Sequence, residues 1–210
     1  MLLKEGDHVL FFGDSITDAG RREKSNHNNH LGVGYVALIA SRLLARYPRM
    51  NLTFTNRGIS GNRVCDLEKR LQEDVIDAKP TVVSIMIGIN DTWHQFSRNL
   101  VSPLDDFSAA YRRMCARLRD ELSARLVICE PYLLPYPADR LTWRQDFDSR
   151  LEAVRKVGAE FASVYIPLDS LFAAAAREVP PTYWAGDGVH PTPAGHGFIA
   201  EAWIQAVCGP

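Results

Sequence analysis

The chain alternates short, continuously apolar stretches with longer segments in which apolar residues recur every three to four positions. Short apolar runs rich in β-branched residues are typical of strands that are buried on both faces of a sheet. They predict strands at 8–12, 51–56, 81–87, 125–130 and 164–167. The longer segments have helical periodicity and predict helices at 34–47, 63–77, 105–123, 143–162 and 194–207.

This alternation predicts an α/β fold in which a parallel sheet is covered by helices on both faces. We expect one domain over residues 1–210, a three-layer α/β/α arrangement with a five-stranded parallel sheet of the flavodoxin-like type. Ligands of open parallel sheets bind at the carboxyl ends of the strands. Polar residues that directly follow a predicted strand are therefore the first candidates for a functional site.

A serine follows the first predicted strand, and an aspartate and a histidine stand close together near the C-terminus. Residues 13–17 read Gly-Asp-Ser-Ile-Thr, and residues 187–190 read Asp-Gly-Val-His. A serine hydroxyl is a weak nucleophile and needs an adjacent base. His190 is the candidate base for Ser15, and Asp187 is the candidate residue that orients the imidazole and stabilises its protonated form. These residues point to acyl transfer.

Two further motifs offer donors for the oxyanion that such an attack generates. Gly61 lies in 56–62 (Asn-Arg-Gly-Ile-Ser-Gly-Asn) and Asn90 in 88–91 (Gly-Ile-Asn-Asp), each a few residues after a predicted strand. With the N–H of Ser15, the N–H of Gly61 and the amide of Asn90 would make a hole of three donors. Because the three motifs follow parallel strands, we expect them to meet at one edge of the sheet.

The blocks around Ser15, Gly61, Asn90 and His190 resemble, in this order, those of the SGNH hydrolases, also called the GDSL esterase/lipase family. The resemblance covers nearly the whole chain. It implies the SGNH hydrolase fold and hydrolysis of a carboxylic ester through an acyl-serine intermediate, with no cofactor and no metal. The chain lacks Gly-x-Ser-x-Gly, so the α/β-hydrolase nucleophile elbow does not apply.

Within this family, four segments are most similar to intracellular bacterial acetylxylan esterases: 13–21, 32–36, 56–62 and 84–93. This resemblance implies a small ester substrate, an acetylated sugar such as a xylo-oligosaccharide. The final block departs from that branch, in which a tryptophan directly precedes the catalytic aspartate, whereas Ala185 and Gly186 separate Trp184 from Asp187 here. We expect Trp93 and Trp184 to stack on a sugar ring or to wall an acyl pocket.

Other interpretations of the same residues stay open at this point. Ser15 and Asn90 are also residue types that cap helices, and His196 is a second histidine near the C-terminus. His27, His30 and His94 are compatible with a metal site, but three imidazoles without a carboxylate are weak support, and a solvated loop or a subunit contact is the favoured interpretation of the segment 21–30. A lysophospholipase or acyl thioesterase, and a carbohydrate-binding protein with an idle serine, are the alternative functions.

The composition bears on the possible binding partners of the protein rather than on the reaction that it catalyses. The formal net charge of −1 gives no field that favours nucleic acid or an anionic membrane. The N-terminus lacks the features of a signal peptide, and no apolar run approaches the ~20 residues that span a bilayer, so we expect a cytoplasmic protein. Cys65, Cys115, Cys129 and Cys208 have no metal-binding spacing and are expected as reduced thiols. A homo-oligomer is left open.

Overall fold

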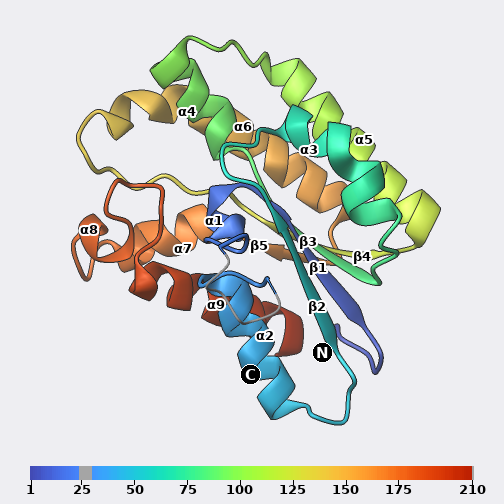
Figure 1. The fold of residues 1–210 in the computed structure, drawn as a ribbon. Coiled ribbons are helices and arrows are strands. Elements are labelled where there is room, and N and C mark those ends of the chain that lie inside the picture. The colour runs from blue at the N-terminus through green and yellow to red at the C-terminus, as the bar shows by residue number, and fades with distance from the viewer. Residues whose placement is uncertain (24–29, 210) are drawn as a thin grey trace.

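The computed structural model, which describes residues 1–23 and 30–209, is built around a five-stranded parallel sheet (Figure 1). Its strands are β1 (His8–Gly13), β2 (Thr53–Gly58), β3 (Val82–Met86), β4 (Arg125–Cys129) and β5 (Val164–Ile166). Their order across the sheet is β2-β1-β3-β4-β5. The strand order therefore reverses at β1, and this flavodoxin-like order places a ligand crevice beyond the carboxyl ends of β1 and β3.

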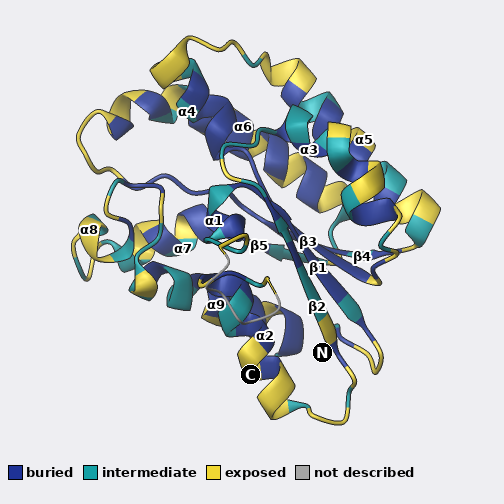
Figure 2. Ribbon diagram, viewed as in Figure 1, coloured by how far each residue is buried: buried dark blue, intermediate teal, exposed yellow. Residues whose placement is uncertain are grey.

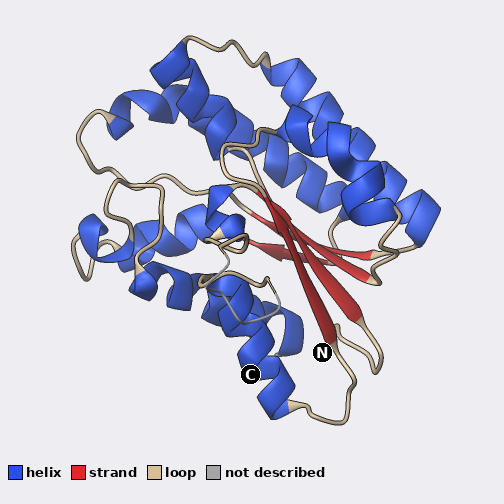
Figure 3. Ribbon diagram, viewed as in Figure 1, coloured by secondary structure: helices blue, strands red, loops and turns tan. Residues whose placement is uncertain are grey.

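Helices cover both faces of the sheet, so the predicted three-layer fold is confirmed (Figure 3). One face carries α2 (Tyr35–Arg46) and α9 (Pro193–Cys208), which pack against each other. The other carries α3 (Val64–Leu71), α5 (Leu104–Leu122) and α6 (Arg140–Phe161). In the described part of the chain, no helix is both long enough and apolar enough to cross a membrane.

Successive residues of each central strand enter different halves of the core. Val9 and Phe11 belong to the cluster that includes α2 and α9, whereas Leu10 and Phe12 belong to the cluster that includes α3 and α5. All four side chains are fully buried, as is most of the sheet in Figure 2. Burial on both faces explains why the strands appear in the sequence as unbroken apolar runs.

Several predicted boundaries are wrong. The strand expected at 51–56 runs from Thr53 to Gly58, because Asn51 adopts a left-handed backbone with φ of 50° and pairing with β1 continues to its last residue. The helix expected at 63–77 is α-helical only to Leu71 and continues as the π-helix η1 (Gln72–Ile76). The helix expected at 143–162 begins earlier, at Arg140.

Sequence patterns also missed the shorter helices, which are α1 (Ser15–Asp18), α4 (Ile89–Arg98), α7 (Leu168–Ala175) and α8 (Pro181–Trp184). α1 and α8 are too short for hydrophobic periodicity to develop. α1 and α4 begin directly beyond β1 and β3. Two residues with expected chemical roles, Ser15 and Asn90, therefore lie in the first turn of a helix rather than in loops.

The cysteines are unpaired, as predicted. Cys115 and Cys129 are buried in the core, and desolvation raises the pKa of each thiol to about 12. A thiol must ionise to act as a nucleophile or a metal ligand. These two residues are therefore packing residues rather than candidates for chemistry.

Candidate active site

Ser15 lies directly beyond the carboxyl end of β1, as the first residue of α1. Asp14 caps this helix, because its Oδ1 accepts the N–H of Ile16 at 3.0 Å. Ser15 is thus not the helix cap that its residue type allowed. A Cβ on Gly13 would lie 2.3 Å from Oγ1 of Thr17, so the tight passage from strand to helix requires glycine.

Ser15, His190 and Asp187 form one continuous chain of hydrogen bonds. Oγ of Ser15 lies 3.0 Å from Nε2 of His190, and Nδ1 of His190 lies 2.7 Å from Oδ2 of Asp187. The other carboxylate oxygen, Oδ1, accepts the N–H groups of Val189 at 3.0 Å and His190 at 2.7 Å. With a carboxylate beside it, Nδ1 carries the imidazole proton and Nε2 is the nitrogen that can accept a proton from serine.

The loop that carries the aspartate and the histidine is held at three consecutive carbonyl groups, those of residues 187–189. They accept hydrogen bonds from Nε of Arg140 at 3.1 Å, the N–H of Leu134 at 2.9 Å and the hydroxyl of Tyr132 at 2.7 Å, respectively. All three donors come from the segment that follows β4. Sequence reasoning missed them, because a donor that binds a distant carbonyl leaves no local motif.

The charged forms of Asp187 and His190 stabilise each other. Burial opposes ionisation of Asp187, but hydrogen bonds from the His190 ring and from the N–H groups of His190 and Val189 outweigh it and lower the pKa of Asp187 to about 2. The same bond to Asp187 raises the pKa of His190 against the effect of burial. An ionised aspartate beside Nδ1 can therefore stabilise a protonated His190.

This arrangement predicts the acid side of the pH profile. His190 accepts a proton only when neutral, so kcat/KM is expected to fall as the pH drops through its pKa. Because Asp187 raises that pKa, the midpoint should lie above the ordinary value of 6.5 for histidine, and Asp187→Asn should move it down. Initial rates on 4-nitrophenyl acetate across the pH range measure both midpoints.

Asp14 is the control for that measurement, because burial raises its pKa to about 7 and it could titrate in the same range. An Asp14→Asn variant keeps a residue type that caps helices. It should retain the acid limb if His190 is the titrating group. Loss of the limb in this variant, or a wild-type midpoint below 6.5, would contradict the assignment.

Gly61 occupies a turn that only glycine readily adopts. The N–H of Asn62 bonds the carbonyl of Ile59 at 3.2 Å, and Gly61, the third residue of this turn, has φ of +83°. A positive φ at that position is typical of a type II turn. The turn does not use the N–H of its third residue, so this N–H remains a candidate donor to an oxyanion.

Asn90 lies beside that turn. Its Nδ2 donates to the carbonyl of Asn62 at 3.0 Å, and its side chain is largely buried on the first turn of α4. An amide nitrogen has two protons, so one remains for a ligand. The same turn is also bonded to the end of β1, because the N–H of Ile59 donates to the carbonyl of Gly13 at 3.1 Å. Gly13 lies two residues before Ser15. The structure thus joins the segments that carry the three expected donors.

Trp93 contacts the candidate base, with its ring edge-on to His190 at 5.5 Å between centres. The guanidinium of Arg140 lies 4.8 Å from the centre of the Trp93 ring and 3.9 Å from that of Trp143. Phe96 stacks on Trp143 at 5.4 Å and is 43% exposed. A row of aromatic rings therefore leads from the base to the surface. The contact with His190 favours Trp93 as a wall of the site.

Trp184 lies in a different environment. Its ring packs 5.1 Å from Phe198 and 6.3 Å from Phe172, in the cluster between α7 and α9. Its carbonyl accepts the N–H of Thr192 at 2.9 Å, and this bond joins the two ends of the loop that carries His190. These contacts give Trp184 a role in supporting the loop. Its expected contact with substrate stays a prediction.

His196 is not arranged as a base. Its Nδ1 accepts the N–H of Tyr35 at 3.2 Å, and burial lowers its pKa to about 4, with the charge of His190 acting in the same direction. Asp91 is likewise a structural residue, because its two oxygens accept the N–H of Val64 at 3.1 Å and the hydroxyl of Ser102 at 2.8 Å. His196 and Asp91 therefore hold neighbouring segments together, which is a structural role.

The histidines considered as metal ligands receive no further support. His27 lies outside the described residues. Nδ1 of His30 lies 3.4 Å from the carbonyl of Arg21, and His94 is buried on α4. Within 1–23 and 30–209, no group of three or more histidine, cysteine, aspartate or glutamate residues is arranged to hold a metal ion.

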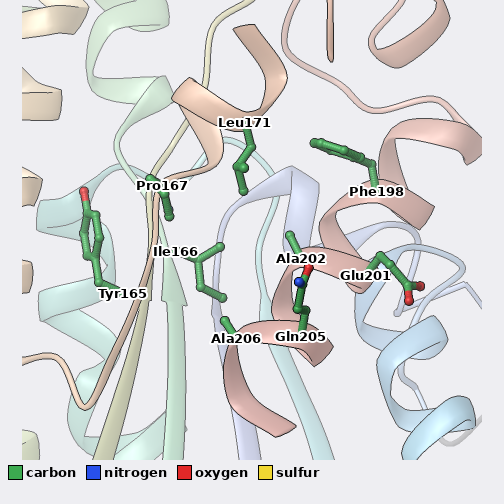
Figure 4. Close-up of a pocket in the computed structure, with 9 residues that line it drawn as sticks. All are labelled: Tyr165, Ile166, Pro167, Leu171, Phe198, Glu201, Ala202, Gln205 and Ala206. Atoms are coloured by element: carbon green, nitrogen blue, oxygen red, sulfur yellow. The ribbon is translucent and has the colours of Figure 1, made fainter. Parts of the chain in front are cut away.

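An apolar hollow of about 320 Å³ opens between β5, α7 and α9, where Leu171 and Phe198 face it together with Ala202 (Figure 4). None of the residues expected to take part in chemistry lines this hollow. The hollow is therefore separate from the candidate active site at the carboxyl ends of β1 and β3.

Comparison with known proteins agrees with this geometry. A sequence model of the GDSL-like lipase/acylhydrolase family matches residues 11–198. An acetylxylan esterase from Geobacillus stearothermophilus is 34% identical over 213 residues, which cover 99% of this chain and 96% of that protein.

Solved structures give the same result. The crystal structure of the Geobacillus esterase superimposes with a TM-score of 0.89 at 33% identity, covering 99% of this chain and 96% of the other. An α/β hydrolase from the metagenome of Lake Arreo, Spain, superimposes with a TM-score of 0.89 at 32% identity, covering 100% and 98%. Structures of the Geobacillus esterase include catalytic mutants in which a serine, an aspartate or a histidine is replaced by alanine.

Proposed function

We propose that this chain, which belongs to the GDSL-like lipase/acylhydrolase family and is a carboxylic-ester hydrolase, removes acetyl groups from carbohydrate, with acetylated xylo-oligosaccharides as substrates. The observation that carries the chemistry is the continuous hydrogen-bond chain from Ser15 through His190 to Asp187. The similarity to an acetylxylan esterase over nearly the full chain supports the substrate.

In the proposed reaction, Oγ of Ser15 attacks the ester carbonyl while Nε2 of His190 takes its proton. The negative charge on the carbonyl oxygen is met by the N–H groups of Ser15 and Gly61 and by the amide of Asn90. His190 then returns the proton to the departing sugar hydroxyl, leaving acetyl on Ser15. Water attacks the acetyl carbon of this intermediate while Nε2 of His190 takes a proton from the water. The bond to Oγ of Ser15 then breaks, His190 returns the proton to Oγ, and acetate leaves.

The aromatic row supports a small acyl group and a sugar as the alcohol. Trp93 lies against His190, so an aromatic wall limits the space beside the base. Phe96 is exposed at the other end of the row and offers a flat apolar face. Flat aromatic faces are suited to packing against a sugar ring.

Acyl-chain length is expected to separate this function from its alternatives. In a series of 4-nitrophenyl esters from C2 to C8, kcat/KM should fall as the chain lengthens, because a walled site excludes the longer acyl groups. Acetylated xylo-oligosaccharides should be deacetylated in the same buffer without added cofactor or metal. Release of acetate, quantified enzymatically, measures the second reaction.

A lysophospholipase or thioesterase would give the opposite slope. An open apolar groove gains up to ~0.8 kcal/mol for each methylene that it buries, so kcat/KM would rise with chain length. A maximum at C8 or beyond would reject the acetyl esterase proposal and favour the lipid or thioester substrate. The proposed roles of Ser15, His190 and Asp187 would be unaffected by that outcome.

A further inference from the structure

One arginine outside the four motifs binds residues of two of them, the segment around Ser15 and the segment 56–62. Arg70 lies on α3, its side chain is 14% exposed, and its guanidinium covers the ring of Phe12 at 4.4 Å. Nη2 donates to the carbonyl of Gly13 at 3.0 Å, and Nη1 donates to the carbonyl of Arg57 at 2.8 Å. Nε donates to Oδ1 of Asn62 at 2.8 Å.

The acceptors are the segments that carry the proposed chemistry. Gly13 ends β1, two residues before Ser15. Asn62 directly follows Gly61, and its carbonyl accepts the amide of Asn90. A single planar group therefore sets the position of the nucleophile's strand relative to the turn of one oxyanion donor, and through that turn relative to the other.

The charge of this arginine is balanced within the same group of residues. Nη1 also contacts Oδ2 of Asp74 at 2.5 Å, so the cation is paired where it is shielded from water. The acceptors lie in fixed directions around one guanidinium, which presents five donors in a rigid fork. Lysine keeps the charge but has a single rotatable ammonium, and it cannot bind the carbonyl of Gly13 and the side chain of Asn62 in this geometry.

We propose that Arg70 is a positioning residue, which holds the N–H of Gly61 and the amide of Asn90 at the distance that the oxyanion requires. This proposal rests on the proposed acyl-enzyme mechanism but not on the sugar substrate. Donors that are displaced by about 1 Å weaken transition-state binding and leave ground-state binding nearly unchanged. A purely structural role for Arg70 would instead reduce the folded fraction.

The test compares Arg70→Lys and Asn62→Ala with the wild-type protein on 4-nitrophenyl acetate. Arg70→Lys should lower kcat about 10- to 100-fold with little change in KM, because a misplacement near 1 Å costs about that much. Asn62→Ala removes the link to the Gly61 turn and should lower kcat in the same way. The double variant should lose less than the product of the two effects, since both break one connection. Arg113→Lys, at an exposed ion pair with Glu68, is the matched control.

A second measurement separates positioning from folding. The rate at which an organophosphonate modifies Ser15 should fall in parallel with kcat, while circular dichroism and the melting temperature report the folded fraction. If Arg70→Lys does not fold, Asn62→Ala decides alone, because Asn62 is only partly buried. The proposal is overturned if Asn62→Ala keeps kcat within about two-fold of wild type, if the losses appear only in KM, or if the two effects multiply. A wild-type protein that hydrolyses no ester would instead reject the proposed function.

Discussion

Replacing Ser15 by alanine is expected to abolish ester hydrolysis while the protein stays folded. The hydroxyl lies 3.0 Å from Nε2 of His190, which makes it the group that forms the covalent bond in the proposed mechanism. Removal of a serine nucleophile costs on the order of 10⁶ in kcat. The fold should survive, because the cap of α1 is Asp14 and alanine is a good helix former.

Mass spectrometry makes this prediction specific to one residue. After reaction with an organophosphonate, the wild-type protein should carry a single adduct on Ser15, and the Ser15→Ala variant should carry none. Ser41→Ala, at an exposed position on α2, is the matched control and should keep both activity and the adduct. An adduct on another residue, or activity in Ser15→Ala near the wild-type level, would reject Ser15 as the nucleophile.

The sequence was sufficient to predict the centre of the sheet because the central strands are buried on both faces. β1, β3 and β4 are short runs of apolar residues between polar segments, and few other structures bury such runs. The edge strand β2 was predicted less well, since Thr53, Thr55 and Arg57 are polar or charged and do not continue an apolar run. Strand boundaries at the edge of the sheet depend on pairing with the neighbour, which a local pattern does not contain.

The same reasoning explains why the candidate site was predictable. Parallel strands end at one edge of the sheet, so motifs that follow β1, β2 and β3 must lie near each other wherever their side chains point. The short loop 187–190 then brings the aspartate and the histidine together. Neither constraint places this loop beside Ser15, so the expected pairing of Ser15 with His190, 175 positions apart, also depended on the residue types and on the resemblance to the SGNH hydrolases.

Residues that act by holding others could not be predicted in this way. Arg140 and Tyr132 bind carbonyl groups of the loop at 187–189, and Arg70 binds the carbonyl of Gly13. Carbonyl groups are present in every residue, so no sequence feature marks the ones that are bound. The position of the Trp184 side chain could not be predicted for a related reason, because its contacts with Phe172 and Phe198 depend on how α7 and α9 pack.

The helix α4 is a different case, since a signal was present. Ile89, Trp93 and Phe96 recur at helical spacing, and they place Trp93 against His190 and Phe96 against Trp143. The polar residues between them made the segment look like a loop. An apolar period of three to four residues in an otherwise polar segment predicts a surface helix with one apolar face.

Asn90→Ala is expected to lower kcat about 10²- to 10³-fold, with a much smaller change in KM, because one oxyanion donor is worth that much in rate. The amide of Asn90 would bind the carbonyl oxygen mainly when that oxygen carries a negative charge. It is therefore an interaction of the transition state rather than of the bound substrate. The loss should be smaller than that of Ser15→Ala, since the N–H groups of Ser15 and Gly61 remain.

Two further variants on the same helix make the result interpretable. Asn90→Asp keeps the size of the side chain but replaces the amide donor by a carboxylate that would repel the oxyanion, so its kcat should be as low as that of Asn90→Ala or lower. Ser97→Ala changes an exposed side chain of α4 and should leave kcat unchanged. Steady-state kinetics on 4-nitrophenyl acetate, with circular dichroism to verify folding, measure all three. A change confined to KM would mean that Asn90 binds the ground-state ester, and the oxyanion would then depend on the backbone donors alone.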